Sequence, residues 1–408
     1  WAAALETVTR PAAPVAGVAV ALPVGSGADA PGLPGAGQLA ADAVVAAVEA
    51  RLGPGEVEGR ARVEPDRTVL TFLVRPERIG SLFDALGDAA WGPGPGSAAV
   101  QDALRRRSDV LRFEHDSPLR EVDVERRTLL YGAGDPRTRP PGGILAVIDS
   151  LLGPGDVETA LRTVFARGEA RVVVVGPVAS AAATAMAGRT PPPDTLGLPV
   201  DTAGSVAAPS APAPEPATRR LPGTTSAGPA WTTGDRRVVT RPVTSTWLAV
   251  AFPVPADLPR IAVLYVADRM HRELNATPPD PGLFSASVEV VEMPEGEVLL
   301  VRAAVLPEAA PGFEARILAL ADRIAAERDP SFFRFHRGRF RAARLIEEAP
   351  PEAAATRMAA ELLTRGEILE FDEAVWSLSV GMAVETAGAL GPPRILVFGP
   401  DLGGGGNP

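Results

Sequence analysis

Cysteine and lysine are both absent from this sequence of 408 residues, and histidine occurs three times. Without cysteine the chain has no disulfides, no thiolate metal ligands and no cysteine nucleophile. Because all 40 basic residues are arginine, it also has no lysine for a Schiff base or a phosphate-binding P-loop. The histidines, His115, His271 and His336, do not pair at the spacing of one helix turn, which a two-histidine zinc site on a helix requires.

The sequence also lacks long apolar runs and a stripe of basic residues. Apolar stretches such as VVVVG at 172–176 end within a few residues, whereas a membrane-spanning helix needs about 20. The net charge of −10 argues against nucleic acid as a partner. One segment, FFRFHRGRFRAARL at 332–345, mixes arginine and phenylalanine. We expect it to form an amphipathic helix whose Phe side packs and whose Arg side is solvated.

An internal repeat of element order organises the chain. The first half has a strand-like run at 15–25, an Ala-rich helix at 36–52, strands at 57–63 and 67–74, and a helix at 77–90. Helical segments at 98–113, 117–131, 142–152 and 155–167 follow, and a strand at 170–180 closes the half. The second half repeats this order, with strands at 246–254, 283–291 and 296–305 and helices at 258–274 and 313–327. It continues with helical segments to about 389 and closes with a strand at 393–403.

The two closing strands share the frame Arg, four apolar residues, Gly and Pro, as RVVVVGP at 171–177 and RILVFGP at 394–400. Between the halves, residues 190–235 are rich in Pro, Ala, Ser, Thr and Gly, a composition typical of an extended linker. The sequence therefore predicts two similar α+β domains, at 1–190 and 236–408, joined by a Pro/Ala-rich linker at 191–235.

The segment GAGQLAADAV at 35–44 carries Gln38 and Asp42 four residues apart, so on a helix both side chains lie on one face. Two side chains at this spacing can hold one metal ion. From the spacing alone, the pair is a metal site, the remains of one, or ordinary polar groups on a half-exposed helix.

Two further segments carry a family resemblance. LYGAGDPRTRPPGG at 130–143 and the helix leading into it, EHDSPLREVDVERRTLLYG at 114–132, resemble the corresponding segments of insulinase/pitrilysin-type metallopeptidases, with Asp135 where a His is usual. Together with the order of elements, the resemblance covers nearly the whole chain. It implies a tandem α+β fold, and it extends to non-catalytic relatives such as subunits of processing peptidases.

Active members of this family carry Gly-x-Ala-His-x-x-Glu-His at the start of the first long helix. The resemblance places Gln38 at the first zinc-binding His, Ala41 at the Glu that acts as general base, and Asp42 at the second His. The third ligand falls in a helix around 105–114, where Asp109 and Glu114 are the nearest carboxylates. A Gln carbonyl is a weak zinc ligand and Ala41 cannot accept a proton, so we expect no bound metal, no other cofactor and no catalysis by this chain.

In paired members of the family, the non-zinc subunit often holds the substrate with an Arg on the first helix of its C-terminal domain and a Tyr on the following strand. Arg272, in MHREL, fits the Arg position, and Phe284 or Ser285, in GLFSAS, falls where the Tyr would be. Arg272 is then either a substrate-binding residue, with Phe284 beside it, or a surface residue paired with Glu273 or another neighbour.

The sequence therefore predicts a non-catalytic, peptidase-like subunit. It would form a hetero-oligomer with an active homologue that carries the HxxEH motif, and would help hold a peptide substrate. The alternatives are a structural scaffold, like core subunits of respiratory complexes that also resemble this family, and an active zinc metallopeptidase whose motif is misaligned. The compartment, bacterial cytoplasm or periplasm, stays open.

Overall fold

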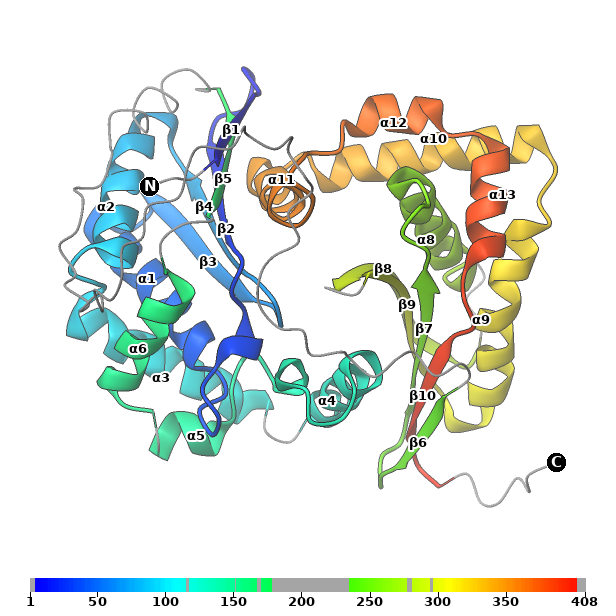
Figure 1. Ribbon diagram of the computed structural model, residues 1–408, viewed down its shortest axis with the longest axis horizontal. Helices are drawn as coiled ribbons and strands as arrows, with labels where there is room; N and C mark the ends of the chain where they lie inside the picture. Colours follow the sequence, from blue (N-terminus) through cyan, green and yellow to red (C-terminus); the bar gives the residue numbers. More distant parts are fainter. Residues whose placement is uncertain are drawn as a thin grey trace, which may run out of the picture.

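The computed structural model describes residues 4–114, 117–150, 152–166, 170–177, 235–276, 281–293 and 296–401. His115 and nearly all of the predicted linker lie outside these ranges, so the predicted domain limits stay a prediction. The described residues form two five-stranded sheets, each with its own helices (Figure 1). The prediction of two similar α+β domains is thereby confirmed.

The first half contains one sheet in the strand order β1-β5-β2-β4-β3. Its strands are β1 (Ala4–Thr9), β2 (Ala16–Leu22), β3 (Val57–Val63), β4 (Thr68–Val74) and β5 (Arg171–Gly176). Its helices are α1 (Ala36–Leu52), α2 (Ile79–Trp91), α3 (Gly96–Glu114), α4 (Pro118–Tyr131), α5 (Leu145–Ser150) and α6 (Pro154–Val164).

The second half repeats this topology, in the strand order β6-β10-β7-β9-β8. Its strands are β6 (Arg236–Thr240), β7 (Thr246–Val254), β8 (Leu283–Met293), β9 (Gly296–Val305) and β10 (Arg394–Gly399). Its helices are α8 (Arg260–Leu274), α9 (Ala310–Ala325), α10 (Pro330–Glu347), α11 (Pro351–Arg365), α12 (Phe371–Ser377) and α13 (Val380–Ala389). The strand directions are shared as well, since β2 and β7 pair antiparallel with both neighbours in their sheets.

The sequence prediction missed the first strand of each half. β1 and β6 lie at an edge of their sheets and pair in parallel with the closing strands β5 and β10. Both strands are short, and β6 is mostly exposed. Neither therefore has the run of apolar residues that predicts a buried strand from the sequence. They complete the sheets without contributing to the predicted site.

The two halves exchange one helix each. The first sheet packs against α1, α2 and α6 on one face and against α11, from the second half, on the other. The second sheet packs against α8, α9 and α13 on one face and against α4, from the first half, on the other (Figure 1). α11 lies so close to β2 that a Cβ at Gly17 would overlap the backbone of Pro351 and Glu352. Each sheet is therefore covered on both faces only when both halves are present.

A partly buried ion cluster also joins the halves. Arg67, in the turn between β3 and β4, pairs with Glu292 of β8 at 2.8 Å, and Arg260 and Arg365 each contact the same carboxylate at 3.3 Å. Burial disfavours ionisation of Glu292, but the three arginines outweigh it and hold the pKa of this carboxyl below its ordinary value. The charge of Glu292 is therefore built into the contact between the halves.

The amphipathic helix predicted at 332–345 is present as α10, but only part of its Phe side packs as expected. Phe333 and Phe340, seven residues apart on one face, are buried. Phe332, Phe335 and Leu345 are 40%, 58% and 46% exposed because they lie on other faces of the helix. Among the helices of the described residues, none combines the length and the apolar character needed to cross a membrane.

Candidate functional site

The start of α1 explains the glycines in GAGQ. Gly35 has φ of 95°, a conformation that favours glycine, and a Cβ there would overlap Gly143. The carboxylate of Asp29 accepts hydrogen bonds from the backbone N–H groups of Gly35, at 2.7 Å, and Gly37, at 2.8 Å. These bonds satisfy donors that the first turn of a helix leaves free. The helix start is thus held in place, which fixes the positions of the next residues.

Gln38 is buried, with 5% of its surface exposed, and its side chain reaches β3. Its Nε2 donates to Oδ1 of Asp42 at 2.8 Å and to the carbonyl oxygen of Ala61 at 3.2 Å. Its Oε1 accepts a hydrogen bond from the backbone N–H of Val63 at 3.2 Å. Gln38 is therefore not an ordinary polar group on a half-exposed helix; its carboxamide joins α1 to the outer strand of the sheet.

Asp42 forms an ion pair with Arg107 of α3. Its Oδ2 accepts hydrogen bonds from Nη2 of Arg107 at 2.8 Å and from Nε at 3.3 Å, while its Oδ1 accepts from Gln38. Burial raises the pKa of the Asp42 carboxyl, and Arg107 and Gln38 oppose this shift. Both carboxylate oxygens are thus engaged by side chains of the protein.

These donors do not fit the ligand set that zinc prefers. A guanidinium already lies 2.8 Å from Asp42, and it would repel a divalent cation at the same place. Ala41, at the position of the general base, is fully buried and carries no ionisable group. Asp109 and Glu114, the carboxylates expected nearest to a third ligand position, are both exposed, and Asp109 pairs with Arg112 at 3.5 Å.

No group of three or more His, Asp or Glu side chains within the described ranges is arranged to hold a metal ion.

Asp135, where the family usually has a His, caps a short 3-10 turn. Its Oδ1 accepts a hydrogen bond from the backbone N–H of Arg137 at 2.8 Å, and the Arg137 guanidinium lies over the ring of Tyr131, 4.6 Å from its centroid. The nearby Arg139 donates to the carbonyl oxygen of Asp29 at 2.9 Å. The segment at 130–143 therefore supports the loop that holds the start of α1.

Arg272 lies on α8, and its Nε donates to Oδ2 of Asp268 at 2.7 Å. Its side chain is 21% exposed. Glu273, the neighbour proposed as its partner, pairs instead with Arg269 and with Arg323. The local partner of Arg272 is thus Asp268, one turn earlier on the helix.

Phe284 lies at a bulge near the start of β8 and is 61% exposed. Its ring is therefore open to contact with another molecule. Whether Arg272 and Phe284 bind substrate stays a prediction.

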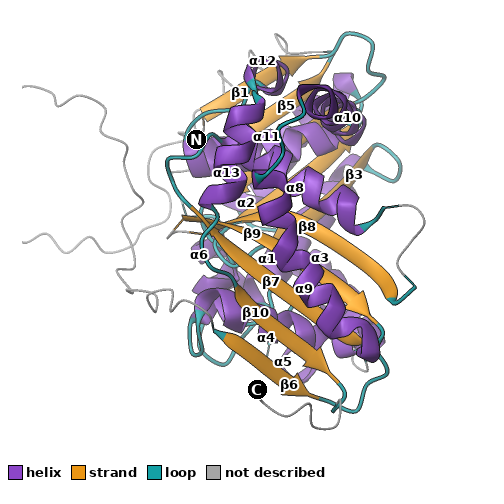
Figure 2. Ribbon diagram, turned by 90° about the vertical axis from the view of Figure 1, so that its right-hand side faces the viewer, coloured by secondary structure: helices purple, strands orange, loops and turns teal. Residues whose placement is uncertain are grey.

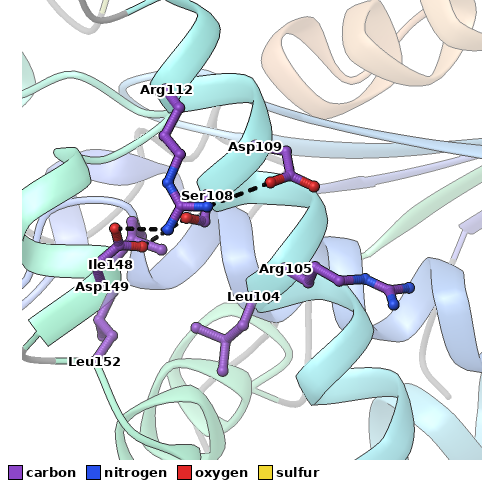
Figure 3. Close-up of a pocket in the computed structure, with 8 residues that line it drawn as sticks. All are labelled: Leu104, Arg105, Ser108, Asp109, Arg112, Ile148, Asp149 and Leu152. Atoms are coloured by element: carbon purple, nitrogen blue, oxygen red, sulfur yellow. Dashed lines mark hydrogen bonds and ion pairs between the residues drawn. The ribbon is translucent and has the colours of Figure 1, made fainter.

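A small pocket of about 350 Å³ lies between α3 and α5, lined by Leu104, Arg105, Ser108, Asp109, Arg112, Ile148, Asp149 and Leu152 (Figure 3). Ser108 donates from Oγ to Asp149 at 2.6 Å, and Arg112 pairs with the same carboxylate at 3.1 Å. The hydrogen bond from Ser108 and the charge of Arg112 hold the pKa of Asp149 below its usual value. Such a carboxylate is a weak base, so this pair does not provide an activated serine.

Arg107 is the residue of the site that sequence reasoning missed. The signal was indirect: Asp42 interrupts an apolar run on α1, and a carboxylate partly removed from water needs a partner. Three consecutive arginines, at 105–107, lie on the following long helix. Nothing in the sequence shows which of them faces α1, because that depends on how the two helices pack.

Comparison with known proteins gives the fold. No protein-family model and no curated protein matches the sequence. Among solved structures, a protease from Helicobacter pylori has 15% identity and a TM-score of 0.74, with 97% of each chain covered. The peptidase M16 inactive domain from Pseudomonas fluorescens has 13% identity and a TM-score of 0.68, covering 98% of this chain and 96% of that one. A chain of complex III2 from Candida albicans has 12% identity and a TM-score of 0.69, covering 97% and 93%.

At these identities the likeness establishes the fold alone. The chain has the two-domain α+β fold of M16-type peptidases over essentially its whole length. The fold expected from the sequence resemblance is therefore confirmed.

Proposed function

We propose that this chain belongs to the M16-type peptidases as a non-catalytic subunit, which pairs with a zinc-bearing homologue and helps hold its peptide substrate. One observation carries the proposal. At the positions that the resemblance assigns to the two histidines, Gln38 binds the edge of β3 and Asp42 binds Arg107. In this chain, hydrogen bonds and an ion pair thus join α1 to β3 and to α3 at the positions where the resemblance places metal ligands. Catalysis would belong to the partner.

A scaffold role is the second candidate, and the likeness to a chain of complex III2 supports it. The two roles differ in what Arg272 does. A substrate-holding subunit needs an Arg that can release Asp268 and bind a carbonyl or carboxylate of the peptide. A scaffold needs no such contact.

Co-expression with a homologue that has an intact HxxEH motif tests the proposal. We expect a stable hetero-oligomer that cleaves peptides, with zinc bound only by the homologue. Arg272→Ala should lower turnover without dissociating the complex. Arg334→Ala, on the exposed side of α10, is the matched control and should leave turnover unchanged.

A complex whose turnover is insensitive to Arg272→Ala would favour the scaffold. Stoichiometric zinc in the isolated chain, together with peptide cleavage, would refute the non-catalytic role.

A further inference from the structure

The helix α10 carries a second apolar stripe on the side that faces away from the core. Phe333 and Phe340 pack in the core of the second half, together with residues of α8 and α12. Because a helix has 3.6 residues per turn, the members of the second stripe lie on the opposite side of α10: Phe335, Gly338, Ala342 and Leu345. All four are exposed, and α10 itself lies at the outside of the second half, next to α8 and α12 (Figure 1, Figure 2). We call these four residues the outer stripe.

The large side chains of the outer stripe are open to solvent. Phe335 is 58% exposed, Leu345 is 46% exposed, and Ile346, beside Leu345, is 74% exposed. Single exposed apolar residues are common on protein surfaces, whereas a contiguous row of them marks an interaction site. The members of the outer stripe follow one another at intervals of three, four and three residues. This is the spacing of the apolar seam by which two helices pack against each other.

The corresponding helix of the first half has a solvated outer face. α3 precedes the exchanged helix α4 as α10 precedes the exchanged helix α11. Large apolar side chains of α3 are exposed only in its last turns, at Val110 and Phe113. Along the rest of its outer face the exposed residues are polar or charged: Gln101, Arg105, Asp109 and Arg112. The fold therefore does not require an apolar outer face at this place, and the outer stripe is particular to α10.

Arginines flank the outer stripe. At 3.6 residues per turn, Arg339 lies on one side of it and Arg341 on the other. Arg341 pairs with Asp372 of α12 at 2.9 Å. Arg339 is exposed, its guanidinium lies over the ring of Phe335, 5.6 Å from the centroid, and no carboxylate of the described residues forms an ion pair with it. A second copy of α10 would bring arginine against arginine, so the charge favours a partner with acidic flanks.

The middle of the outer stripe is low. A Cβ at Gly338 would meet nothing within 4 Å, so no contact inside the chain requires a glycine there, although glycine is less favourable than alanine within a helix. Between the ridges formed by Phe335 and Leu345, the small residues Gly338 and Ala342 leave a notch. Such a notch admits a side chain of a second helix at close approach. A lipid surface would contact the ridges and leave the notch unfilled.

From these features we propose that the outer stripe of α10 binds an amphipathic helix of a partner protein. The apolar face of that helix would cover Phe335 and Leu345, and its acidic residues would lie beside Arg339. At 1.5 Å per residue, the outer stripe is about 15 Å long, so about three turns of the partner helix cover it. The proposed function assigns no role to this face of α10, and the partner helix is not the peptide substrate.

The probe is a fluorescein-labelled peptide helix three heptads long, with Leu along its seam and Glu on both flanks, where Glu also opposes self-association. Its binding to the full chain is measured by fluorescence anisotropy. Gly338→Gln fills the notch. Gly312→Gln, at an exposed glycine of α9 whose Cβ would likewise meet nothing within 4 Å, is the matched control. We expect saturable binding to the unmodified chain and to Gly312→Gln, and affinity about tenfold lower for Gly338→Gln. Both variants should fold, because each replaces an exposed helical glycine with a better helix former.

A second probe, with Lys in place of each Glu, tests the charge. The unmodified chain should bind the Glu probe about tenfold more tightly than the Lys probe. Arg339→Glu should abolish or reverse this preference, because the charge beside the outer stripe then changes sign. Contact through apolar side chains alone would give no such reversal.

Absence of saturable binding of the Glu probe, equal affinity of the two glycine variants, or a charge preference that Arg339→Glu leaves unchanged would each overturn the proposal. Binding of the chain to phosphatidylserine vesicles without binding of the Glu probe would also overturn it, since the outer stripe would then contact a lipid surface. The measurement uses this chain alone. Failure to pair with a zinc-bearing homologue would therefore leave helix binding intact, and failure of helix binding would leave the pairing intact.

Discussion

The ion pair between Asp42 and Arg107 gives a quantitative test of the idea that a guanidinium takes the structural place of a metal ion. In Arg107→Met the Asp42 carboxylate loses its cation while it stays largely enclosed. The two side chains are 26% and 17% exposed, so the pair is neither fully buried nor on the surface. Breaking a buried pair costs about 3–5 kcal/mol, and an exposed pair contributes about 0–1 kcal/mol. We therefore expect Arg107→Met to lower the free energy of unfolding by about 2–3 kcal/mol.

Thermal unfolding followed by circular dichroism measures this cost, which corresponds to a fall in Tm of roughly 2–5 °C for a chain of this length that unfolds as one unit. Arg106→Met is the control, because this neighbouring side chain is 65% exposed and its loss should change stability by less than about 0.5 kcal/mol. The double variant Asp42→Leu with Arg107→Met removes both charges and should lie within about 1 kcal/mol of the unmodified protein. Equal Tm values for Arg107→Met and Arg106→Met would refute the reasoning.

Two further predictions concern packing and pH. Gly17→Ala should lower the free energy of unfolding by at least about 1–3 kcal/mol, because its Cβ would overlap the backbone at Pro351. Gly87→Ala is the control, since a Cβ there lies in open space on α2, and it should raise the free energy of unfolding by about 0.5–1 kcal/mol. A Gly17→Ala variant of unchanged stability would contradict the close contact of α11 with β2. Burial and nearby arginines lower the pKa of His336 from 6.5 to about 4. As the pH falls, the unfolded chain therefore binds a proton at this residue at a higher pH than the folded chain does. The free energy of unfolding should accordingly decrease as the pH drops from 6.5 towards 4. His336→Gln should reduce the loss of Tm over that range, and an unchanged pH profile would show that His336 does not contribute.

The parts of the fold that sequence analysis predicted are those with a strong local pattern. The Ala-rich helix at 36–52 and the strands at 57–63 and 296–305 have the predicted limits. Each is a local stretch with a clear pattern: alternation in the strand at 57–63, and a nearly continuous apolar run in the other two. The contact between Gln38 and Asp42 also follows from helix geometry alone. Their other contacts lie 23 residues away, at Ala61, and 65 residues away, at Arg107. Those contacts depend on how α1 packs on β3 and α3, which no local pattern encodes.

The exchange of α4 and α11 shows that the two similar halves of the chain are not independent folding units. By sequence the chain divides at the linker, which suggests two units that could each fold alone. By packing it does not divide there, because α11 covers the small residues Ala19 and Ala21 on the inner face of the first sheet, and α4 buries Leu129 and Leu130 against the second. Removing either half would expose an apolar sheet face in the other. The two halves are thus held in a fixed relation, which the ion pair between Arg67 and Glu292 reinforces across their contact.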